Sequence, residues 1–390
     1  MFRMGKEEVD AVTKIIMDKA LFRINSKYKE VDQFEKEFAA HMGVNHCLCL
    51  SSGTGALIAS LTALGIGPGD EVIIPGYTFM ATAMAVLAVG AIPVLAEVDE
   101  TLTIDMKDVA SKITKETKAV IPVHMQGFPC DMDPLLDLKK KHGFYIIEDA
   151  CQSDGGSYKG KHLGSIGDCG AFSFNYFKII SCGEGGAVLT NDLKTFQRAI
   201  IYHDVGTSFW AYDQPITEPL FSGINMRSNE ILGAILRVQL KRLDGIITDL
   251  RKVKKTIMDS TSNLSGIRYN PSYDIAGDCG VCLPLIFDTI EKAERFEKAM
   301  GEPCHRPINT GKHVYSAWTP VLEKRGAYII GMDPYYNPKN KELRMDVTEK
   351  TCPKTLDYLC RTVYFPMNCD WTEAEVSQKI DLIKNAAKKI

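Results

Sequence analysis

The feature that most constrains the fold of this chain is the alternation of apolar strands with helices up to about residue 240. Short runs rich in Val and Ile are each followed by a stretch with apolar spacing near 3.6 residues. The predicted strands are 46–50, 71–75, 92–98, 119–123, 145–149, 171–174 and 187–190. Such runs, separated by helices, are typical of a mostly parallel sheet covered on both faces. We therefore predict an α/β fold, in which the last two strands form an antiparallel pair.

The length and a change of character predict two domains. A chain of 390 residues exceeds the roughly 250–300 residues at which a single hydrophobic core stops growing. A helical pattern over 223–249 is followed by shorter strands, helices and loops, with a last helix over 373–388. We predict a large domain over 1–250, including an N-terminal helix, and a small α+β domain over 251–390.

Charge and composition exclude several functional classes. The net charge of −3 gives no basic patch for nucleic acid, and no apolar run reaches the ~18 residues of a membrane helix. The N-terminus lacks the apolar core of a signal peptide, so we expect a cytoplasmic protein whose 12 cysteines are reduced. Cys279 and Cys282 form a single C-x-x-C without a second ligand pair, and we predict no metal site.

Ligands of parallel α/β sheets bind beyond the carboxyl ends of the strands, and several polar segments lie there. Small residues at 51–55 begin a helix after the first strand, an arrangement that suits a phosphate or is a plain helix cap. Asp149 ends an apolar strand and needs a partner, such as a pyridinium nitrogen, a metal or a helix end. Gln152 follows within reach of the same strand end.

One lysine has an unusual setting. Lys178 follows the strand 171–174 within an aromatic and apolar stretch, and a glycine-rich turn at 182–186 comes next. Apolar surroundings favour the neutral amine, which is the nucleophile that a Schiff base with an aldehyde requires. The alternative is one more surface lysine.

Together these segments resemble one family. The matching pieces are SSGTGAL, PGYTFMATA, EDACQS, GDCGAFSFNYFK, CGEGGAVLTND and GINMRSNEILGAI. They are similar to the DegT/DnrJ/EryC1/StrS sugar aminotransferases, which are pyridoxal 5′-phosphate (PLP) enzymes of the aspartate aminotransferase fold, PLP fold type I. The resemblance implies a homodimer with shared active sites, an amino-acid donor such as L-glutamate, and a keto-sugar acceptor.

The resemblance also implies roles for individual residues. Lys178 forms the Schiff base and moves the proton, and Asp149 pairs with the pyridinium nitrogen. The ring of Phe79 is implied to stack on the cofactor ring, and Gln152 to contact its phenolic oxygen. Gly53, Thr54 and Ser173 are implied to hold the phosphate. Asn225 is implied to reach the phosphate of the partner subunit's cofactor. Asn175 departs from many relatives, which carry His there, and this puts the local hydrogen bonds in doubt.

The sugar is the least determined part. The loop 304–315 offers Arg306, Lys312 and His313 for a diphosphate or a carboxylate, or is a solvated surface loop. The sequence also resembles bacterial aminotransferases that convert 8-oxo-3-deoxy-manno-octulosonate to its 8-amino sugar for lipopolysaccharide. A nucleotide-linked 4- or 3-keto hexose is the alternative.

Three other classes of protein fit the sequence less well. A nicotinamide dehydrogenase lacks its G-x-G-x-x-G after the first strand. A cysteine desulfurase would need an activated thiol, and Cys304 and Cys369 have no evident activator. A non-catalytic scaffold of the same fold remains the third alternative.

Overall fold

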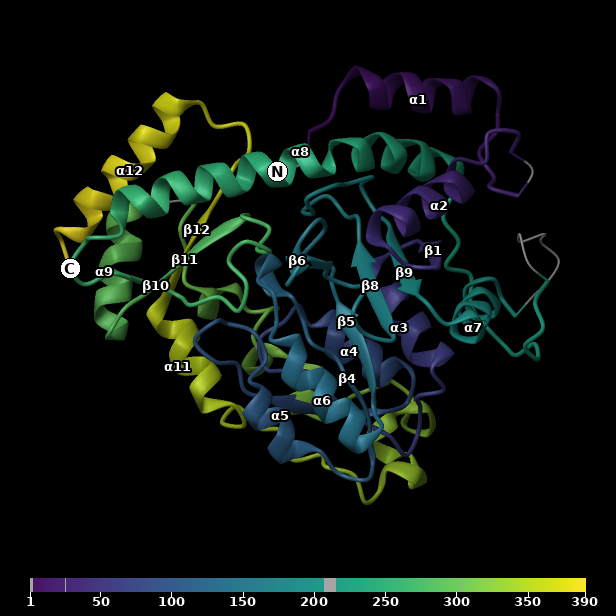
Figure 1. The fold of residues 1–390 in the computed structure, drawn as a ribbon. Helices are drawn as coiled ribbons and strands as arrows, with labels where there is room; N and C mark the ends of the chain where they lie inside the picture. The colour runs from purple at the N-terminus through teal and green to yellow at the C-terminus, as the bar shows by residue number, and fades with distance from the viewer. Residues whose placement is uncertain (1–2, 25, 207–214, 302) are drawn as a thin grey trace.

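The computed structural model describes residues 3–24, 26–206, 215–301 and 303–390. Its main body is a sheet with helices on both sides, as predicted (Figure 1). The strands of this sheet are β1 (His46–Leu50), β2 (Glu71–Pro75), β3 (Ile92–Ala96), β4 (Thr117–Val120), β5 (Tyr145–Asp149), β8 (Cys169–Ser173) and β9 (Gly186–Thr190). A two-stranded hairpin precedes β8 and consists of β6 (Ser157–Tyr158) and β7 (Lys161–His162).

Most helices of this main body alternate with its strands, but α1 and α2 are consecutive and no helix separates β5, β8 and β9. They are α1 (Lys6–Met17), α2 (Glu30–Met42), α3 (Gly53–Ala63), α4 (Ala81–Ala88), α5 (Met106–Lys112), α6 (Met132–His142) and α7 (Leu193–His203), with a 3-10 turn η1 (Met125–Gly127). The long helix α8 (Glu230–Thr261) follows α7.

The seven strands that the structure describes in the main sheet lie in the order β1-β9-β8-β5-β4-β2-β3. Neighbours from β8 through β5, β4 and β2 to β3 are parallel, whereas β9 is antiparallel to both β8 and β1. The antiparallel pair of β8 and β9 was predicted from the short spacing of the two segments. Since β9 reverses direction between them, β1 and β8 point the same way, and the carboxyl ends of β1, β2, β5 and β8 share one edge of the sheet.

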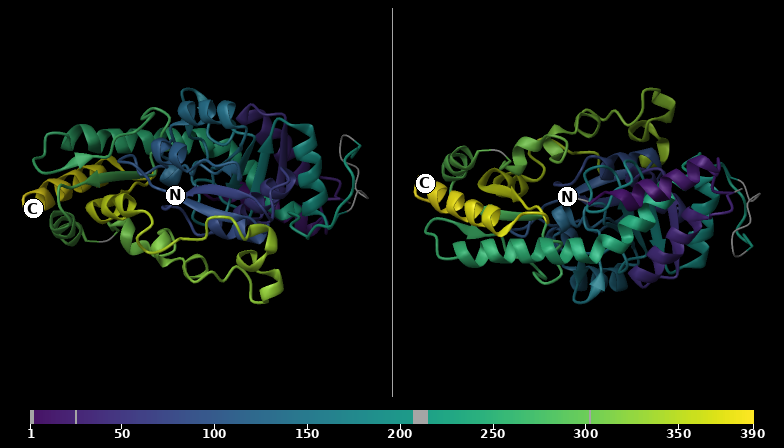
Figure 2. Two further views of the ribbon diagram at one scale, coloured as in Figure 1. Left: turned by 90° about the horizontal axis from the view of Figure 1, so that it is seen from below. Right: turned by 90° about the horizontal axis from the view of Figure 1, so that it is seen from above.

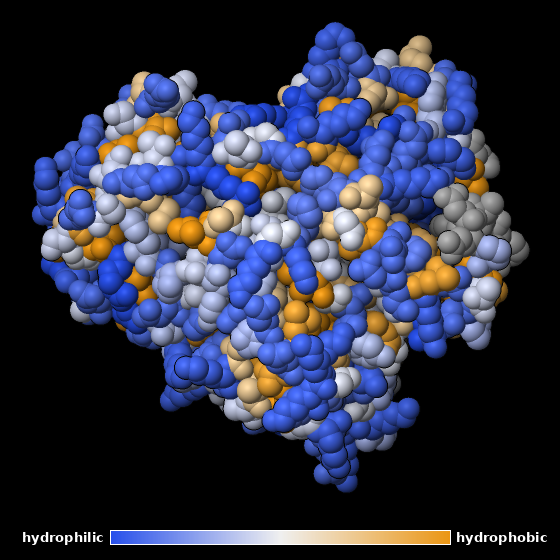
Figure 3. Space-filling model, in the orientation of Figure 1, coloured by the Kyte–Doolittle hydropathy of each residue, from blue (hydrophilic) through white to orange (hydrophobic). Residues whose placement is uncertain are grey.

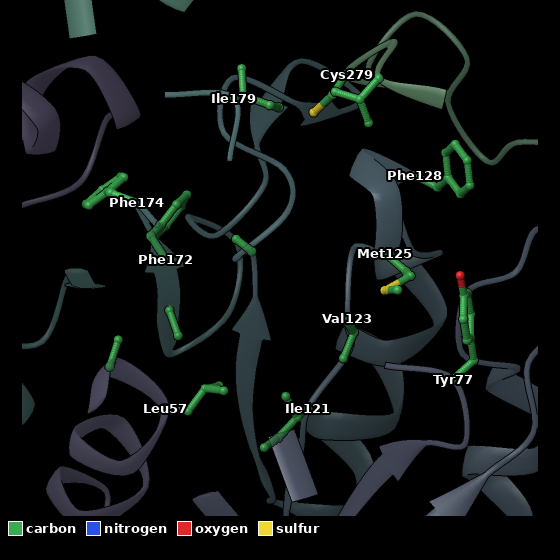
Figure 4. Close-up of a cluster of buried hydrophobic side chains, with 14 of the residues drawn as sticks. Leu57, Tyr77, Ile121, Val123, Met125, Phe128, Phe172, Phe174, Ile179 and Cys279 are labelled. Carbon is green, nitrogen blue, oxygen red and sulfur yellow. The ribbon is translucent and has the colours of Figure 1, made fainter. Parts of the chain in front are cut away.

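Both faces of the sheet are buried, which explains its continuous apolar runs. Val72 and Ile74 on β2 belong to one core with α3 and α4, while Ile73 points into a second core with α5 and α6. Figure 4 shows part of the larger core, from Leu57 on α3 through Phe172 on β8 and Phe174 just after it to Tyr77.

The C-terminal part forms a second, smaller layer of strands and helices. Its elements are β10 (Arg268–Tyr269), β11 (Cys282–Ile286), β12 (Thr362–Pro366), α9 (Ile290–Met300), α10 (Thr319–Leu322), α11 (Pro353–Arg361) and α12 (Glu373–Ala387). The three strands pair antiparallel in chain order. Between α9 and α11 the chain forms short 3-10 turns, η2 (Pro307–Thr310), η3 (Tyr315–Ala317), η4 (Ile330–Met332), η5 (Pro334–Tyr336) and η6 (Pro338–Asn340). This long segment lies along the main body (Figure 2).

Helix α8 joins the two parts and runs along both of them (Figure 1). It packs on α1 and α2 at one end and on α12 toward the other. Position 250, where the sequence places the domain boundary, lies inside this helix. The helix begins at the Asn229 cap, not near 223, because Ile224 and Met226 donate their N–H groups to carbonyls of Tyr202 and His203 at the end of α7.

Candidate active site

The shared edge of the sheet brings together the first three predicted segments. Gly53 begins α3 directly after β1, and a methyl group added there would lie 2.7 Å from Ser173 Cβ and 2.8 Å from Cys151 Sγ. Ser173 ends β8, and Cys151 follows the end of β5. The start of α3 and the ends of β5 and β8 are therefore in direct contact.

The first turn of α3 has the properties of an anion site. Ser52 caps the helix, and its side chain accepts from Gly55 N at 3.0 Å. The N–H groups of Gly53 and Thr54 have no acceptor within the helix, because the first turn of any helix leaves its N–H groups free. With the positive end of the helix dipole and the hydroxyl of Ser173 beside them, these groups fit the phosphate of PLP.

Asp149 is a buried carboxylate held by two donors. Its Oδ2 accepts from Thr82 Oγ1 at 2.7 Å, and its Oδ1 accepts from the backbone N of Cys151 at 3.2 Å. The side chain is almost fully buried, so a cation or a further donor is required to offset its charge. A protonated pyridine nitrogen fits that need. Thr82 was missed in the sequence, although it lies one helical turn beyond Phe79 in the same motif.

Lys178 lies on the loop after β8, where its backbone N donates to Asn175 O at 3.1 Å. Asn175 Oδ1 accepts from Phe177 N at 3.0 Å, so the residue that departs from the family pattern closes the turn before the lysine. The surroundings are less apolar than expected. Ile179 and Ile180 are buried, but Tyr176 and Phe177 are 65% and 72% exposed.

The C-terminal loop meets the main body at Phe79. Thr78 N donates to His313 O at 3.0 Å, and Met80 N donates to Lys312 O at 2.9 Å. The Phe79 ring lies 5.5 Å from the His313 ring and 5.7 Å from Lys312 Nζ. Burial, helped by the charges of Lys312 and Lys178, lowers the pKa of His313 to about 4, so this ring is neutral at pH 7. Lys312 is exposed.

Arg306 is not directed at this site. Its guanidinium pairs with Glu297 at 2.9 Å and with Glu294 at 3.1 Å, both on α9, and 13% of the side chain is exposed. Two carboxylates already neutralise this cation, so it has no free charge for a substrate.

The side chains of Gln152 and Asn225 each accept a hydrogen bond from a backbone N–H, for Gln152 from the turn η1 and for Asn225 from its own loop. Gln152 Oε1 accepts from Gln126 N at 3.1 Å, and Asn225 Oδ1 accepts from Arg227 N at 3.1 Å. Asn225 is exposed beside Met226, whose sulfur would lie 3.2 Å from a Cβ on Gly55. The segment of Asn225 therefore flanks the first turn of α3.

The two histidines left unassigned by the sequence are held by their own surroundings. His124 Nδ1 accepts from Cys130 N at 3.2 Å, and its Nε2 lies 3.0 Å from Glu148 Oε2. His203 Nδ1 donates to Ile200 O at 2.6 Å, and burial lowers the pKa of His203 to about 4. Both side chains are fully buried.

The thiols considered for a desulfurase are not activated. Burial raises the pKa of Cys304 to about 12 and also raises the pKa of Cys369. A raised pKa keeps a thiol protonated and unreactive. This removes the support for that alternative.

A separate cavity of about 320 Å³ lies between α2 and α7 and is lined by none of the residues predicted for the site. Among the described residues, no group of three or more His, Cys, Asp or Glu side chains is placed to hold a metal ion. No helix in the described ranges is long and apolar enough to cross a bilayer.

Comparison with known proteins agrees with this geometry. The DegT/DnrJ/EryC1/StrS aminotransferase family model matches residues 3–384. The spore coat polysaccharide biosynthesis protein SpsC of Bacillus subtilis (strain 168) is 33% identical, covering 99% of this chain and 95% of the relative. The dTDP-3-amino-3,6-dideoxy-alpha-D-galactopyranose transaminase of Aneurinibacillus thermoaerophilus is 41% identical, over 78% of this chain and 84% of that protein.

Solved structures share the fold over the whole chain. The S. venezuelae protein DesV, crystallised in complex with a ketimine intermediate, has a TM-score of 0.78 and 27% identity, covering 98% of this chain and 95% of its own. The structure of 3-amino-5-hydroxybenzoic acid synthase has a TM-score of 0.81 and 26% identity, covering 100% and 98%.

The fold is that of the PLP-dependent aminotransferases of fold type I. The chain belongs to the DegT/DnrJ/EryC1/StrS family and is a sugar aminotransferase.

Proposed function

We propose that the enzyme moves an amino group from L-glutamate to a keto sugar at the edge of the sheet where β1, β2, β5 and β8 end. The observation that carries this proposal is the contact of three elements there. An anion site is supplied by the first turn of α3 together with Ser173. The buried Asp149 supplies a carboxylate, and the loop after β8 supplies the amine of Lys178. These are the groups that the phosphate, ring nitrogen and aldehyde of PLP require.

Each residue then has one task. The N–H groups of Gly53 and Thr54 with the Ser173 hydroxyl hold the phosphate, and Asp149 keeps the ring nitrogen protonated. The bound cofactor supplies an electron sink for the carbanion formed when a substrate carbon loses its proton. The amine of Lys178 would hold the cofactor covalently through its aldehyde and, when free, would accept and return the proton of the substrate carbon.

Three more residues complete the proposed site. Phe79 stacks on the pyridine ring of the cofactor, and the side chain of Gln152 turns toward the phenolic oxygen of the cofactor. For Gln152 this requires giving up the bond from Gln126 N. Asn225 reaches the phosphate of the partner subunit's cofactor.

We propose a nucleotide-linked 4- or 3-keto hexose as the acceptor. Several relatives of 38–41% identity are named as makers of nucleotide-linked amino sugars, among them GDP-perosamine synthase of Escherichia coli O157:H7. Lys312 is exposed beside Phe79, where its charge can meet a diphosphate. The neutral His313 can donate or accept a hydrogen bond to a sugar hydroxyl.

The second candidate acceptor is 8-oxo-3-deoxy-manno-octulosonate, which would place the enzyme in lipopolysaccharide synthesis. Its single carboxylate needs one cation, and Lys312 can supply it. Arg306, which the sequence favoured for this carboxylate, is bound by Glu294 and Glu297 and is left out of the proposal.

A homodimer is also part of the proposal. Tyr176 and Phe177 expose large apolar surfaces next to Lys178, and Leu220 and Ile224 do so next to Asn225. A second copy that covered these side chains would exclude water from the site. Sedimentation velocity on the purified protein gives the oligomeric state directly.

The first experiment is an absorption spectrum of the purified protein with PLP, before and after L-glutamate. A band at the edge of the visible range should move to shorter wavelength with glutamate. Lys178→Ala should lack that band, while Lys194→Ala, an exposed lysine on α7, should keep it. Without a band in the wild type, the cofactor site is misplaced. A band that ignores glutamate rules out this donor.

The same assay separates the acceptors. Protein converted by glutamate is mixed with a dTDP- or GDP-linked keto hexose, or with 8-oxo-3-deoxy-manno-octulosonate, and the return of the first band is followed. Return with the nucleotide sugar alone supports the first candidate, and return with the octulosonate alone supports the second. No return with either excludes both sugars.

A further inference from the structure

The loop beside Phe79 is hydrogen-bonded along its length to the main body. Residues 311–318, which we call the strap, run antiparallel to residues 76–80, which carry Phe79. Besides the two backbone bonds described above, Tyr315 N donates to Gly76 O at 3.0 Å. Three backbone hydrogen bonds therefore join these two described segments.

Trp318, at the end of the strap, is fully buried and bonds the main chain of Lys312. Its Nε1 donates to Lys312 O at 3.2 Å. The same oxygen accepts from Met80 N at 2.9 Å, so both lone pairs of this carbonyl are used. An indole has a single polar atom, and Trp318 uses it for this bond. The backbone of Lys312 is thereby bonded both to the segment of Phe79 and to a buried side chain.

A second buried side chain, Tyr315, joins the middle of the strap to the C-terminal layer. Its hydroxyl donates to Glu349 O at 2.8 Å and accepts from Cys352 N at 2.9 Å. Cys352 directly precedes α11. On the other side, a methyl group added at Gly76 would lie 3.1 Å from the ring of Tyr315, so the two are closely packed. The strap is therefore fixed from both layers of the molecule.

The strap combines this fixed main chain with an exposed charged side chain. Lys312 is exposed, and its Nζ lies 5.7 Å from the centre of the Phe79 ring. A long side chain loses rotamer freedom when it binds a charged ligand, and this loss lowers affinity. Because the backbone of Lys312 is already fixed, less freedom remains to be lost when its charge meets an acceptor.

We propose that Trp318 is a positioning residue that fixes Lys312 beside Phe79 for the acceptor. It acts through the main chain of Lys312, not by contact with the sugar. The inference rests on the proposed acceptor role of Lys312 and adds the residue that sets the place of this lysine. The juxtaposition of a buried donor, a shared carbonyl oxygen and an exposed ammonium group is what carries it.

The first test measures the order of the strap without any substrate. Trypsin cuts after a lysine only when the chain around it opens locally, so cleavage after Lys312 reports on the strap. Trp318→Phe keeps an aromatic side chain and removes the indole N–H. In full-length protein, cleavage after Lys312 should become about two- to tenfold faster, as expected for the loss of one neutral hydrogen bond. Cleavage after Lys159, in the hairpin of β6 and β7, should not change. Peptide mass spectrometry measures both rates, and an unchanged rate at Lys312 overturns the inference.

The second test asks whether the acceptor depends on this bond. Protein converted by L-glutamate is mixed with the keto sugar that restores the first absorption band, over a series of sugar concentrations. In Trp318→Phe the half-saturating concentration should rise about two- to tenfold, while the limiting rate stays within about twofold, because a misplaced Lys312 weakens binding and not the proton transfer. A lower limiting rate at an unchanged half-saturating concentration overturns the inference. Trp371→Phe is the matched control, since Trp371 is half-buried and stacks on Phe365 away from the strap, and it should behave as the wild type in both tests.

A double variant separates positioning from general packing. If Trp318 acts through Lys312, the effect of Trp318→Phe on the half-saturating concentration should largely disappear in the Lys312→Ala background. An equal effect in both backgrounds shows that Trp318 serves packing alone, and overturns the inference. If Trp318→Phe does not fold, benzothienylalanine at position 318, which has the shape of tryptophan without its N–H, replaces it in every test.

The outcomes also separate this inference from the proposed function. If Lys312→Ala alone leaves the half-saturating concentration unchanged, the acceptor role of Lys312 in the proposed function fails, and the inference fails with it. If Lys312→Ala raises that concentration and Trp318→Phe does not, only the role of Trp318 is overturned. If no sugar restores the absorption band, the proposed acceptors fail, and cleavage after Lys312 still decides whether Trp318 fixes the strap.

Discussion

At the scale of single residues, neighbours decide what each ionisable side chain does. Asp149 and Asp154 lie five positions apart, and both are buried. Asp149 accepts two hydrogen bonds, whereas Asp154 accepts none among the described residues. The two neighbouring carboxyl groups thus differ in their surroundings, since donors hold one of them and none within the described residues bonds the other.

Thr82 should matter through Asp149. Thr82→Val keeps the shape of the side chain but removes the hydroxyl that donates to Asp149 Oδ2 at 2.7 Å. A hydrogen bond to a charged group contributes about 1.5–3 kcal/mol, so kcat/KM should fall by roughly ten- to a hundredfold. Steady-state kinetics with the accepted sugar measures this. Thr248→Val, on the exposed side of α8, should stay near wild type, and equal losses in both variants would contradict the role of Thr82.

At the scale of elements, the first turn of α3 depends on the absence of a side chain at Gly53. A methyl group there would lie within 2.8 Å of both Ser173 Cβ and Cys151 Sγ, closer than side chains approach. Gly245 on α8 has no atom within 4 Å of the same position. The two glycines are thus a matched pair, one with a packed surrounding and one open.

Gly53→Ala should therefore destabilise the protein by about 1–3 kcal/mol and weaken PLP binding, because α3 must move away from Ser173. Gly245→Ala should stabilise the protein by about 0.5–1 kcal/mol, since alanine loses less backbone freedom in a helix. Thermal melts with and without PLP distinguish the two effects. Equal PLP affinity in Gly53→Ala and wild type would show that the phosphate lies elsewhere.

The sequence predicted most elements of the main body, because burial on both faces requires unbroken apolar runs. The strands β1, β2 and β5 have the predicted bounds, and the others differ by a few residues. The misplaced ends have long-range causes. Helix α4 begins only at Ala81, although PGYTFMATA gives no local reason for a later start, because N–H groups of Thr78 and Met80 bond the 312–313 loop, over 200 positions away. No local pattern records such a contact.

The site was predictable to a similar degree. Residues at strand ends, such as Asp149 and Ser173, follow from the fold because parallel strands end at one edge. The engagement of Arg306 by α9 did not, since it depends on where a helix of the second layer lies.

At the scale of the whole molecule, the surface is mostly hydrophilic (Figure 3). Some ion pairs lie on this surface, and others are buried. The exposed pair of Lys255 and Asp259 lies one residue along α8 from Lys254, whose pair with Asp278 is buried. The buried pair ties α8 to the loop before β11, within the second layer of the molecule. The same helix thus carries one pair of each kind.

Asp278→Asn should lower the free energy of unfolding by about 3–5 kcal/mol, because it leaves the Lys254 charge buried without its counter-charge. Asp259→Asn should cost about 0.5 kcal/mol or less, since its pair is solvated. Urea denaturation of both variants tests this. Similar midpoints would show that water reaches Lys254.

The continuity of α8 across position 250 also limits how this enzyme can be recombined with its relatives. A chimera joined at 250 would build α8 from two halves of different proteins. Side chains that do not match would then disturb the packing of α8 on α1, α2 and α12. A junction after Thr261, in the turn that ends at Gly266, would exchange the whole second layer with its 312–313 loop and leave α8 intact. We therefore expect acceptor preference to be transferred only when all residues beyond this helix are exchanged together.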